Sequence, residues 1–432
     1  MRNILLFGAG KSAISLIEYL TDESRKQGWH LTIGANDLTI IRSKTREVEW
    51  VTMVAIDIQD EIPRRDLISK SDIVISLLPP SFHRLVAVDC LHYRKNLLTA
   101  SYVDEYIRAL SGEVSKYGLI FLCEIGLDPG IDHMSVMSLV TRIRSQEGKV
   151  TSFKSHTGGL VAPESDNNPW RYKISWNPRN VVLAGSTGAT FRENGKTRKI
   201  EYRQLFEECR PVYIDGLGEL NYYPNRNSLE YMPLYGLEDV DTFIRTTLRY
   251  PEFCQLWKCV VAAKLADDTF LKDPNSLTFK TWSAAIMRFI DNRNIEAYEF
   301  LGLFSDKRLP ASAKTSADVL QYLMERKLAM EPTDKDMIVM LHEVEYSANN
   351  EKCSVQSSLV VKGKDSSHTA MAKTVGLPLG IAAKLVLMEK FKLPGVRIPV
   401  EPEIYRPVLK ELEEHDIIFK ESTHRISAGS LE

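Results

Sequence analysis

The chain has 432 residues, of which 44% are hydrophobic and 26% charged, a composition typical of soluble globular proteins. At about 150 residues per domain, this length predicts two or three domains. The 55 Lys and Arg residues balance 57 Asp and Glu residues, and the net charge of -2 argues against a dedicated nucleic-acid or membrane-surface protein. The six cysteines lack a CxxC pair and favour a reducing compartment, and no metal site is expected.

Targeting and membrane-spanning segments are not expected. The first residues lead directly into an apolar strand-like run, without the pattern of a signal peptide. No stretch approaches the roughly 18 apolar residues of a membrane span. These features predict a soluble cytoplasmic protein.

The first 125 residues alternate strand-like and helix-like segments. The apolar run at 4–7 is typical of a parallel strand buried on both faces, and apolar residues at 13, 16, 17 and 20 predict a helix after it. Further strands are expected at 31–33, 73–78, 97–98 and 120–122. This βαβ alternation predicts an α/β fold with a doubly wound parallel sheet.

The pattern changes near residue 130. Strands of an antiparallel or mixed sheet are expected at 150–157, 180–184 and 199–203, bounded by turn residues. Residues 251–335 have a mostly helical pattern, and the segments 337–346 and 353–362 predict a long hairpin around Asn349-Asn350. A helix follows at 371–391, where Pro378 marks a start or kink, and then Pro-rich connections at 394–407.

A glycine loop joins the first strand to the first helix. The segment from Gly8 to Ala13 fits G-x-G-x-x-A, in which Gly8 allows the tight turn, Gly10 admits a pyrophosphate and Ala13 keeps helix and sheet close. The helix N-terminus adds free N–H groups and a positive dipole. A Walker A loop would need a glycine where Leu5 stands. The loop therefore predicts a Rossmann dinucleotide site, with a mere tight turn as the alternative.

Cofactor choice should depend on the residue after the second strand. Asp37 stands there, and a carboxylate at this position binds the ribose 2′-hydroxyl and repels a 2′-phosphate, which favours NAD over NADP. Arg42 and Lys44 follow and would soften that preference. Alternatively, Asp37 only caps the next helix.

The segment 124–133 follows the fifth predicted strand, at the edge where open α/β sheets bind ligands. Its two glycines, proline and two aspartates predict a tightly specified loop, either functional or an elaborate helix cap with Asp132 as the cap residue. Loops at 155–164, 223–228 and 246–250 also concentrate polar and turn-forming residues. Their arginines suit planar carboxylates, although each alone is as well explained by a surface ion pair.

Motifs along nearly the whole chain resemble the glutamate-forming saccharopine dehydrogenases. The matching segments are Gly126-Leu127-Asp128-Pro129-Gly130-Ile131-Asp132-His133, Gly158-Gly159, Ala162-Pro163-Glu164, Asn168-Pro169, Tyr172-Lys173, Ser175-Trp176, Tyr223-Pro224-Asn225-Arg226, Leu248-Arg249-Tyr250, 302–306 and 371–378. The resemblance implies oxidation of saccharopine with a nicotinamide cofactor, followed by hydrolysis of the imine to glutamate and 2-aminoadipate 6-semialdehyde.

The resemblance also implies a domain organisation. The Rossmann domain would comprise residues 1–130 and about 365–432. A substrate-binding and dimerisation α/β domain with a mixed sheet would comprise 131–250 and about 336–364, and a helical domain 251–335. A homodimer is expected, with no nucleic-acid or membrane partner.

Site residues are carried over by motif. Asp128 and Tyr102 are the expected catalytic pair, in which Asp128 holds or deprotonates the substrate amine, and His133 and His156 are further acid–base candidates. His133 is equally well explained as a structural residue at a helix start. The expected substrate contacts are Ser101, Tyr102, Asp128, Trp176, Arg226, Thr247, Leu248 and Arg249. The expected cofactor contacts are Gly8, Gly10, Lys11, Ser12, Ala13, Asp37, Asp57, Ile58, Leu78, Ser101, Ile125, Gly126, Leu127, Asp128 and Pro129.

The chain departs from the family pattern at three positions. Thr157 stands where the family usually has cysteine, so a thiol role there does not transfer, and His156 and Asn227 replace the usual tyrosine and aspartate. The fungal biosynthetic branch carries an arginine for NADP after the second strand, whereas Asp37 is similar to the NAD-using, lysine-degrading branch. The alternatives are an NADP-dependent reductase of lysine biosynthesis, a relative that acts on another amino-aldehyde, and a non-catalytic nucleotide-binding scaffold.

Overall fold

The computed structural model describes residues 1–426, and the chain divides into two compact units. Unit 1 consists of Met1–Arg142 and Ser367–Ile418, and unit 2 consists of Ile143–Ser366 and the described residues that follow Ile418. Each unit therefore combines segments that are distant in sequence. The expected domain boundaries near residues 130 and 365, and a separate helical domain at 251–335, stay predictions.

Unit 1 contains a parallel sheet of seven strands in the order β16-β6-β5-β4-β1-β2-β3. Its strands are β1 (Asn3–Phe7), β2 (His30–Ala35), β3 (Val51–Ala55), β4 (Ile73–Ser76), β5 (Asn96–Thr99), β6 (Ile120–Leu122) and β16 (Gly395–Arg397). Strand β1 pairs in parallel with both β2 and β4, so the strand order reverses direction beside it. The predicted doubly wound sheet is confirmed, and this reversal creates the crevice in which such sheets bind ligands.

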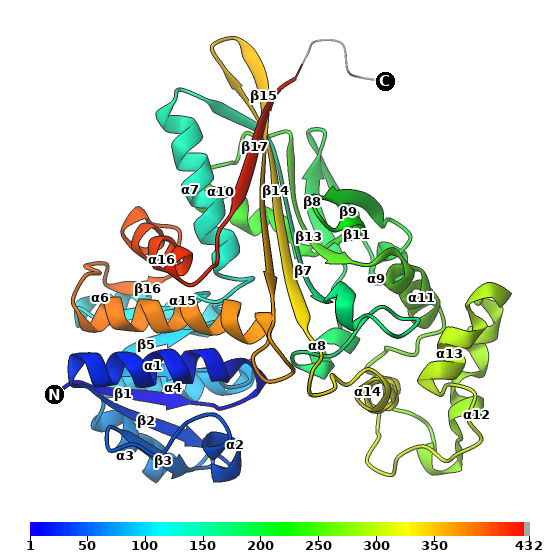
Figure 1. Cartoon of the computed structure of the whole chain (residues 1–432), viewed down its shortest axis with the longest axis horizontal. Helices are drawn as coiled ribbons and strands as arrows, with labels where there is room; N and C mark the ends of the chain where they lie inside the picture. Colours follow the sequence, from blue (N-terminus) through cyan, green and yellow to red (C-terminus); the bar gives the residue numbers. More distant parts are fainter. Residues whose placement is uncertain (427–432) are drawn as a thin grey trace. The chain divides into compact units, whose positions relative to one another are not determined.

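Helices connect and cover these strands. They are η1 (Lys11–Ala13), α1 (Ile14–Gln27), α2 (Leu38–Arg42), α3 (Glu61–Ser69), α4 (Pro80–His92), α5 (Glu105–Ala109), α6 (Ser111–Lys116), α7 (Ile131–Ser145), α15 (Ala370–Leu387) and α16 (Pro402–Glu414). Helices α1 and α15 lie side by side (Figure 1). Gly376 permits this approach, because a Cβ there would lie 2.8 Å from the backbone nitrogen of Leu16.

Helix α15 corrects one expectation from the sequence. Its 18 residues have a mean hydropathy of 1.5, which is long and apolar enough to cross a membrane. However, 78% of this helix is buried inside the structure. The helix therefore has the burial of a core helix, and its apolar composition follows from packing on α1.

Unit 2 contains a mixed sheet of ten strands, whose main path is β10-β11-β13-β7-β14-β15-β17. Its strands are β7 (Lys149–Val161), β8 (Ala189–Glu193), β9 (Lys196–Ile200), β10 (Arg210–Ile214), β11 (Gly218–Pro224), β12 (Arg226–Asn227), β13 (Thr242–Arg249), β14 (Asp336–Ala348), β15 (Glu351–Lys362) and β17 (Lys420–Arg425). The predicted hairpin is confirmed as β14 and β15. Asn349 and Asn350 both have positive φ angles, as a tight hairpin turn requires.

The remaining elements of unit 2 are helical. They are η2 (Pro163–Ser165), α8 (Pro178–Val182), α9 (Tyr202–Leu205), η3 (Ser228–Tyr231), α10 (Met232–Tyr235), α11 (Pro251–Ala262), η4 (Pro274–Ser276), α12 (Phe279–Ser283), η5 (Ala284–Arg288), η6 (Asn292–Asn294), α13 (Ile295–Leu301) and α14 (Ser316–Lys327). The strand predicted at 180–184 is wrong, because Asn177 caps a short helix that begins at Pro178. The Pro-rich segment 394–407 likewise holds strand β16 and the start of α16.

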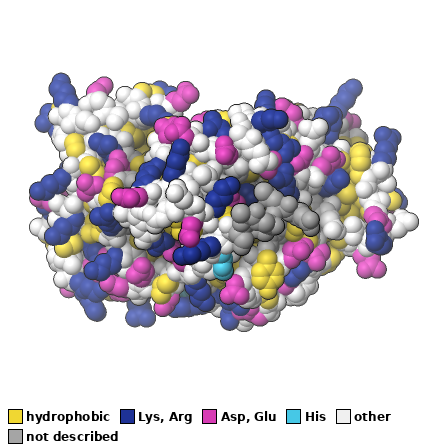
Figure 2. Space-filling model, turned by 90° about the horizontal axis from the view of Figure 1, so that it is seen from above, with side chains coloured by type: hydrophobic (Ala, Val, Ile, Leu, Met, Phe, Trp, Pro, Cys, Tyr) yellow, Lys and Arg dark blue, Asp and Glu magenta, His cyan; other side chains and the backbone are white. Residues whose placement is uncertain are grey.

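Charged side chains of both signs are mixed on the face that Figure 2 shows. Figure 2 shows Lys and Arg side chains interspersed with Asp and Glu over one face of the molecule. This distribution agrees with the near-neutral net charge of -2.

Candidate active site

The glycine loop follows β1 at the reversal point of the parallel sheet. Gly8 has a φ of +100°, and a Cβ there would lie 2.6 Å from the carbonyl oxygen of Leu77, so only glycine fits. At Gly10, no atom lies within 4 Å of where a Cβ would be. Lys11 is exposed, Ser12 is partly buried, and Ala13 is buried at 1% exposure. Open backbone at Gly10 and the start of α1 together suit an incoming pyrophosphate.

Asp37 caps helix α2 at the carboxyl end of β2. Its Oδ1 accepts hydrogen bonds from Thr39, at 2.8 Å from the backbone nitrogen and 2.7 Å from the hydroxyl. These bonds lower the pKa of Asp37, and the residue is exposed. Asp37 therefore caps this helix, and its ionised carboxylate stands at the position expected to face the ribose; contact with the ribose stays a prediction.

Three other expected cofactor residues lie at the ends of the next strands. Asp57, after β3, is exposed and accepts a hydrogen bond of 2.9 Å from the backbone nitrogen of Gln59. Ile58 is 8% exposed and belongs to the hydrophobic core of unit 1, and Leu78, after β4, packs against the same core.

The loop from Glu124 to Gly130 folds back on itself before α7. The nitrogen of Gly126 donates to the carbonyl oxygen of Pro129 at 3.0 Å, and a Cβ at Gly130 would lie 2.2 Å from the nitrogen of Gly126. The Asp128-Pro129 peptide bond is cis. Among residues 119–136, Asp128 is the one that is not fully buried. In this loop Ile125, Leu127 and Pro129 are therefore buried, and Asp128 is the residue that is accessible from outside.

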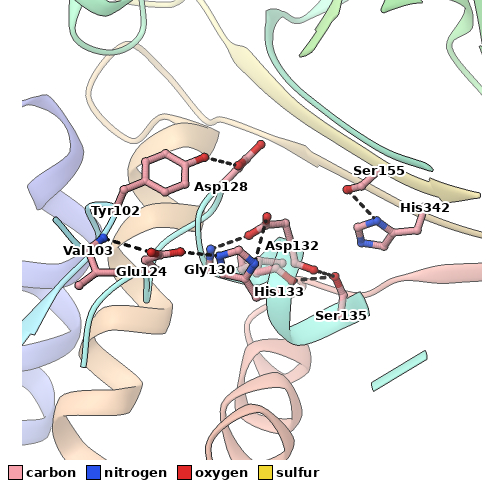
Figure 3. Close-up of polar contacts among 11 residues, drawn as sticks. Tyr102, Val103, Glu124, Asp128, Gly130, Asp132, His133, Ser135, Ser155 and His342 are labelled. Carbon is pink, nitrogen blue, oxygen red and sulfur yellow. Dashed lines mark hydrogen bonds and ion pairs between the residues drawn. The ribbon is translucent and has the colours of Figure 1, made fainter. Parts of the chain in front are cut away.

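Tyr102 and Asp128 are brought together from segments that follow β5 and β6. The Tyr102 hydroxyl donates a hydrogen bond of 3.0 Å to Asp128 Oδ1 (Figure 3). Both side chains are partly exposed. A phenol that supports an accessible carboxylate can hold and move a proton.

Ser101 is held by a buried histidine that sequence analysis missed. His83, on α4, lies 2.8 Å from Ser101 Oγ through Nε2 and 2.8 Å from Ser76 Oγ through Nδ1. Burial lowers the pKa of His83 to about 4, so the ring is neutral at physiological pH. A single histidine among apolar helix residues gives no signal of this role, because its partners come from the end of β4 and from the segment after β5.

Behind the Tyr102–Asp128 pair lies a buried polar cluster. His133 Nε2 is 2.9 Å from Glu124 Oε2, and His133 Nδ1 is 3.5 Å from Asp132 Oδ2 (Figure 3). His133 has 0% exposed surface, Asp132 1% and Glu124 2%. Asp132 accepts a hydrogen bond from the nitrogen of Gly130 but lies within the first turn of α7, so the expectation that it is the cap residue is wrong. His133 is too deeply buried to exchange a proton directly with a substrate.

Unit 2 contains a buried arginine at the end of β13. Arg249 is 4% exposed, and its Nη1 donates to the carbonyl oxygen of Leu248 at 2.8 Å. Its Nε is buried without a hydrogen-bond partner, and no carboxylate within residues 1–426 pairs with it. The guanidinium also lies 5.4 Å from the ring centroid of Tyr172. A buried cation without an internal counter-ion suits an acidic ligand.

The other expected substrate residues of unit 2 differ in their surroundings. Trp176 is partly buried and donates to the Tyr172 hydroxyl at 3.2 Å, next to Arg249. Arg226 is exposed on the short strand β12. Thr247 is partly buried, whereas Leu248 is 0% exposed in a hydrophobic cluster and presents no surface to a ligand.

His156 and Glu343 form a pair across strands β7 and β14, which sequence analysis did not anticipate. His156 Nε2 lies 3.0 Å from Glu343 Oε2, and Nδ1 lies 2.7 Å from the Thr246 hydroxyl. Burial lowers the pKa of His156, which favours a neutral ring that donates to Glu343. The neighbouring Ser155 contacts His342 at 3.1 Å (Figure 3). Within residues 1–426, no group of three His, Cys, Asp or Glu side chains is arranged to hold a metal ion.

An open parallel sheet with a glycine loop at its reversal point, and with an accessible carboxylate and phenol after two other strands of the same sheet, is typical of a dinucleotide-binding oxidoreductase. Two family models match the chain: the saccharopine dehydrogenase NADP binding domain over residues 4–122, and the saccharopine dehydrogenase C-terminal domain over 126–418. The chain therefore belongs to the saccharopine dehydrogenase family.

Known relatives cover nearly the whole chain. The saccharopine dehydrogenase [NADP(+), L-glutamate-forming] of Saccharomyces cerevisiae is 30% identical over 98% of this chain and 99% of its own length. A solved apo structure of the L-Glu-forming yeast enzyme has a TM-score of 0.88 and 30% identity, and the match covers 98% of this chain and 100% of that one. The mouse alpha-aminoadipic semialdehyde synthase, mitochondrial, is 32% identical over 97% of this chain, which spans 47% of that protein.

Proposed function

We propose that this chain is a glutamate-forming saccharopine dehydrogenase of lysine degradation. The reaction would convert saccharopine, NAD and water into glutamate, 2-aminoadipate 6-semialdehyde, NADH and a proton. The single observation that carries the proposal is the hydrogen bond between Tyr102 and Asp128, at the carboxyl edge of the parallel sheet. It supplies an accessible acid–base pair where a dinucleotide-binding sheet carries out its chemistry.

The residues of unit 1 would have separate roles in binding the cofactor and in proton transfer. Gly8 allows the tight turn, Gly10 would leave room for the pyrophosphate, and Ser101 directly precedes Tyr102 in the sequence. When bound, the nicotinamide supplies the hydride acceptor, and the protein orients it. Asp128 would accept the proton of the substrate's secondary amine, and Tyr102 would stabilise the carboxylate and return a proton to the leaving amine.

Arg249 supports an acidic substrate. Its guanidinium is buried without a carboxylate partner among the described residues, so binding one of the substrate's carboxylates would relieve an unfavourable burial. Arg226 would bind a second carboxylate, and Trp176 would line the same site.

The preference for NAD rests on Asp37. Its exposed, ionised carboxylate would accept the ribose 2′-hydroxyl and repel a 2′-phosphate. The family model and the yeast relative carry NADP in their names, so the cofactor has to be tested directly. The variant Asp37→Ser keeps a good helix cap and removes the charge. Its ratio of kcat/KM with NADP to that with NAD should rise at least tenfold.

The test is a spectrophotometric assay of NADH or NADPH formation with saccharopine, NAD and NADP in parallel. We expect saccharopine-dependent reduction of NAD, and loss of turnover by about 10²–10⁴-fold in Asp128→Asn with little change in NADH affinity. Preference of the wild type for NADP would instead support the biosynthetic reductase. Activity only with other amines and aldehydes would support a different member of the fold, and no activity at all would support a scaffold. A homodimer and a cytoplasmic location stay predictions.

A further inference from the structure

The buried cluster of Glu124, His133 and Asp132 is connected at both ends to the Tyr102–Asp128 pair. Glu124 Oε1 accepts a hydrogen bond of 3.1 Å from the backbone nitrogen of Val103, the residue after Tyr102. At the other end, Asp132 Oδ1 accepts one of 2.6 Å from the nitrogen of Gly130, two residues after Asp128.

His133 joins these two ends. Its Nε2 contacts Glu124 at 2.9 Å, and its Nδ1 faces Asp132 at 3.5 Å. The contact of Tyr102 with Asp128 then closes a ring of side-chain and backbone interactions (Figure 3). Every link lies within unit 1.

We propose that His133 is a positioning residue that sets the separation between the Tyr102 hydroxyl and the Asp128 carboxylate. The imidazole lies where the chain after β5 and the chain before α7 have to be held together. With 0% exposed surface, it acts through Glu124 and Asp132 and does not contact substrate. The effect of His133 on turnover rests on the proposed function, whereas the ring of contacts through His133 does not.

Two substitutions at His133 separate its two contacts. The amide nitrogen of Gln can reach about as far as Nε2, so His133→Gln should keep the shorter contact with Glu124. The side chain of Asn is shorter, and its amide nitrogen reaches only about as far as Nδ1. His133→Asn should therefore lose the contact with Glu124. A misplacement of about 1 Å can lower a rate roughly 10²-fold. We therefore expect kcat to fall about 10–100-fold in His133→Asn and to recover partly in His133→Gln, with NADH affinity within twofold of wild type.

The matched control is Tyr405→Phe. The Tyr405 hydroxyl donates a hydrogen bond of 3.0 Å to Thr141 Oγ1, so this variant also removes a hydrogen bond to α7, partly buried and nearer the other end of the helix. Its thermal midpoint should fall by an amount similar to that of His133→Gln, while kcat stays unchanged.

The ring of contacts can also be tested without an activity assay. For this, 3-fluorotyrosine is placed at position 102 and ¹⁹F NMR spectra of the full chain are recorded. We expect His133→Asn to shift or split the resonance, and Tyr405→Phe to leave it as in the wild-type background. An unchanged resonance in His133→Asn, or unchanged kcat, overturns the proposal. If His133→Asn does not fold, Glu124→Gln takes its place, because it keeps an acceptor for Val103 and weakens the contact with His133. Absence of saccharopine oxidation by the wild type would refute the proposed function, and the ¹⁹F comparison would still decide whether the ring exists.

Discussion

The ammonium group of Lys44 donates a hydrogen bond of 2.6 Å to the carbonyl oxygen of Ala9, inside the glycine loop. It also donates to the carbonyl oxygen of Gly10. Partial burial lowers the pKa of Lys44, yet the side chain brings a positive charge to the loop that would receive the pyrophosphate. Lys44 thus brings a positive charge to the loop expected to bind the pyrophosphate, and Asp37 a negative charge to the position expected to face the adenosine ribose.

The first prediction is that Lys44 contributes to affinity and not to selectivity. The Lys44 amine contacts the loop that would bind the pyrophosphate of either cofactor. Lys44→Met should therefore weaken the binding of NAD and of NADP by a similar factor, about 3–10-fold. Fluorescence titration with NADH and NADPH measures this. A loss confined to NADPH would mean instead that Lys44 reads the 2′-phosphate.

Substitution of the two loop glycines should have different effects, on stability at Gly8 and on cofactor binding at Gly10. Gly8→Ala places a Cβ 2.6 Å from Leu77 and keeps a φ unsuited to alanine, so its thermal midpoint should drop by several degrees. Gly10→Ala meets no atom within 4 Å and should fold as the wild type does, but NADH binding should weaken at least tenfold because the methyl group occupies the pyrophosphate's place. Melting curves and NADH titrations distinguish these outcomes. Equal binding by Gly10→Ala and wild type would contradict the cofactor site.

Removing the charge of Arg249 should weaken substrate binding. The variant Arg249→Met keeps an apolar stem against Tyr172, so the apparent KM for saccharopine should rise about 10–100-fold, as expected for a lost hydrogen-bonded charge pair. Arg171 is a suitable control, because its guanidinium already pairs with Asp166 and Glu252. Arg171→Met should leave this KM unchanged. The same KM in Arg249→Met and wild type would place the substrate carboxylates elsewhere.

His83 should make unit 1 sensitive to acid. Burial lowers its pKa from 6.5 to about 4, so the unfolded chain takes up a proton at a higher pH than the folded chain does. The associated stability is fully present above pH 6.5 and is lost as the pH falls toward 4. At about 1.4 kcal/mol per pKa unit, this amounts to about 3 kcal/mol. The thermal midpoint of His83→Gln should therefore fall less between pH 7 and 4.5 than that of the wild type. The control is His424→Gln, because His424 is exposed. If the thermal midpoint changes equally with pH in the wild type, His83→Gln and His424→Gln, the coupling to His83 is refuted.

The sequence predicts the parallel sheet well because its central strands carry continuous apolar runs. Strand β4 is buried at every position, and the predicted glycine loop directly follows β1, which is buried except at its first residue. Strand β16 was missed because it has three residues, two of them partly exposed, and lies in a Pro-rich segment. The apolar run at 181–183 was misread as a strand because periodicity outweighed the capping signal of Asn177 and Pro178.

From the local sequence alone the site was predictable only as separate motifs, and the pairing of Tyr102 with Asp128 was expected only from the family resemblance. Local sequence marks Asp128 and its turn, but nothing local relates Tyr102 to Asp128, since their contact depends on the order of β5 and β6 in the sheet. The partners of His83 and His156 are equally unpredictable. His156 contacts Glu343, 187 residues later, only because β7 and β14 are neighbours.

The interleaving of the two units has a consequence for biosynthesis. The edge strand β16 of unit 1 is made after all the other strands of its sheet, and β17, which pairs with β15 of unit 2, is made later still. A nascent chain halted at residue 366 would thus carry two sheets that each lack a border strand. During that interval the unpaired edges of β6 and β15 are open to other chains, so this stage of synthesis is the one at which chaperones would be needed most.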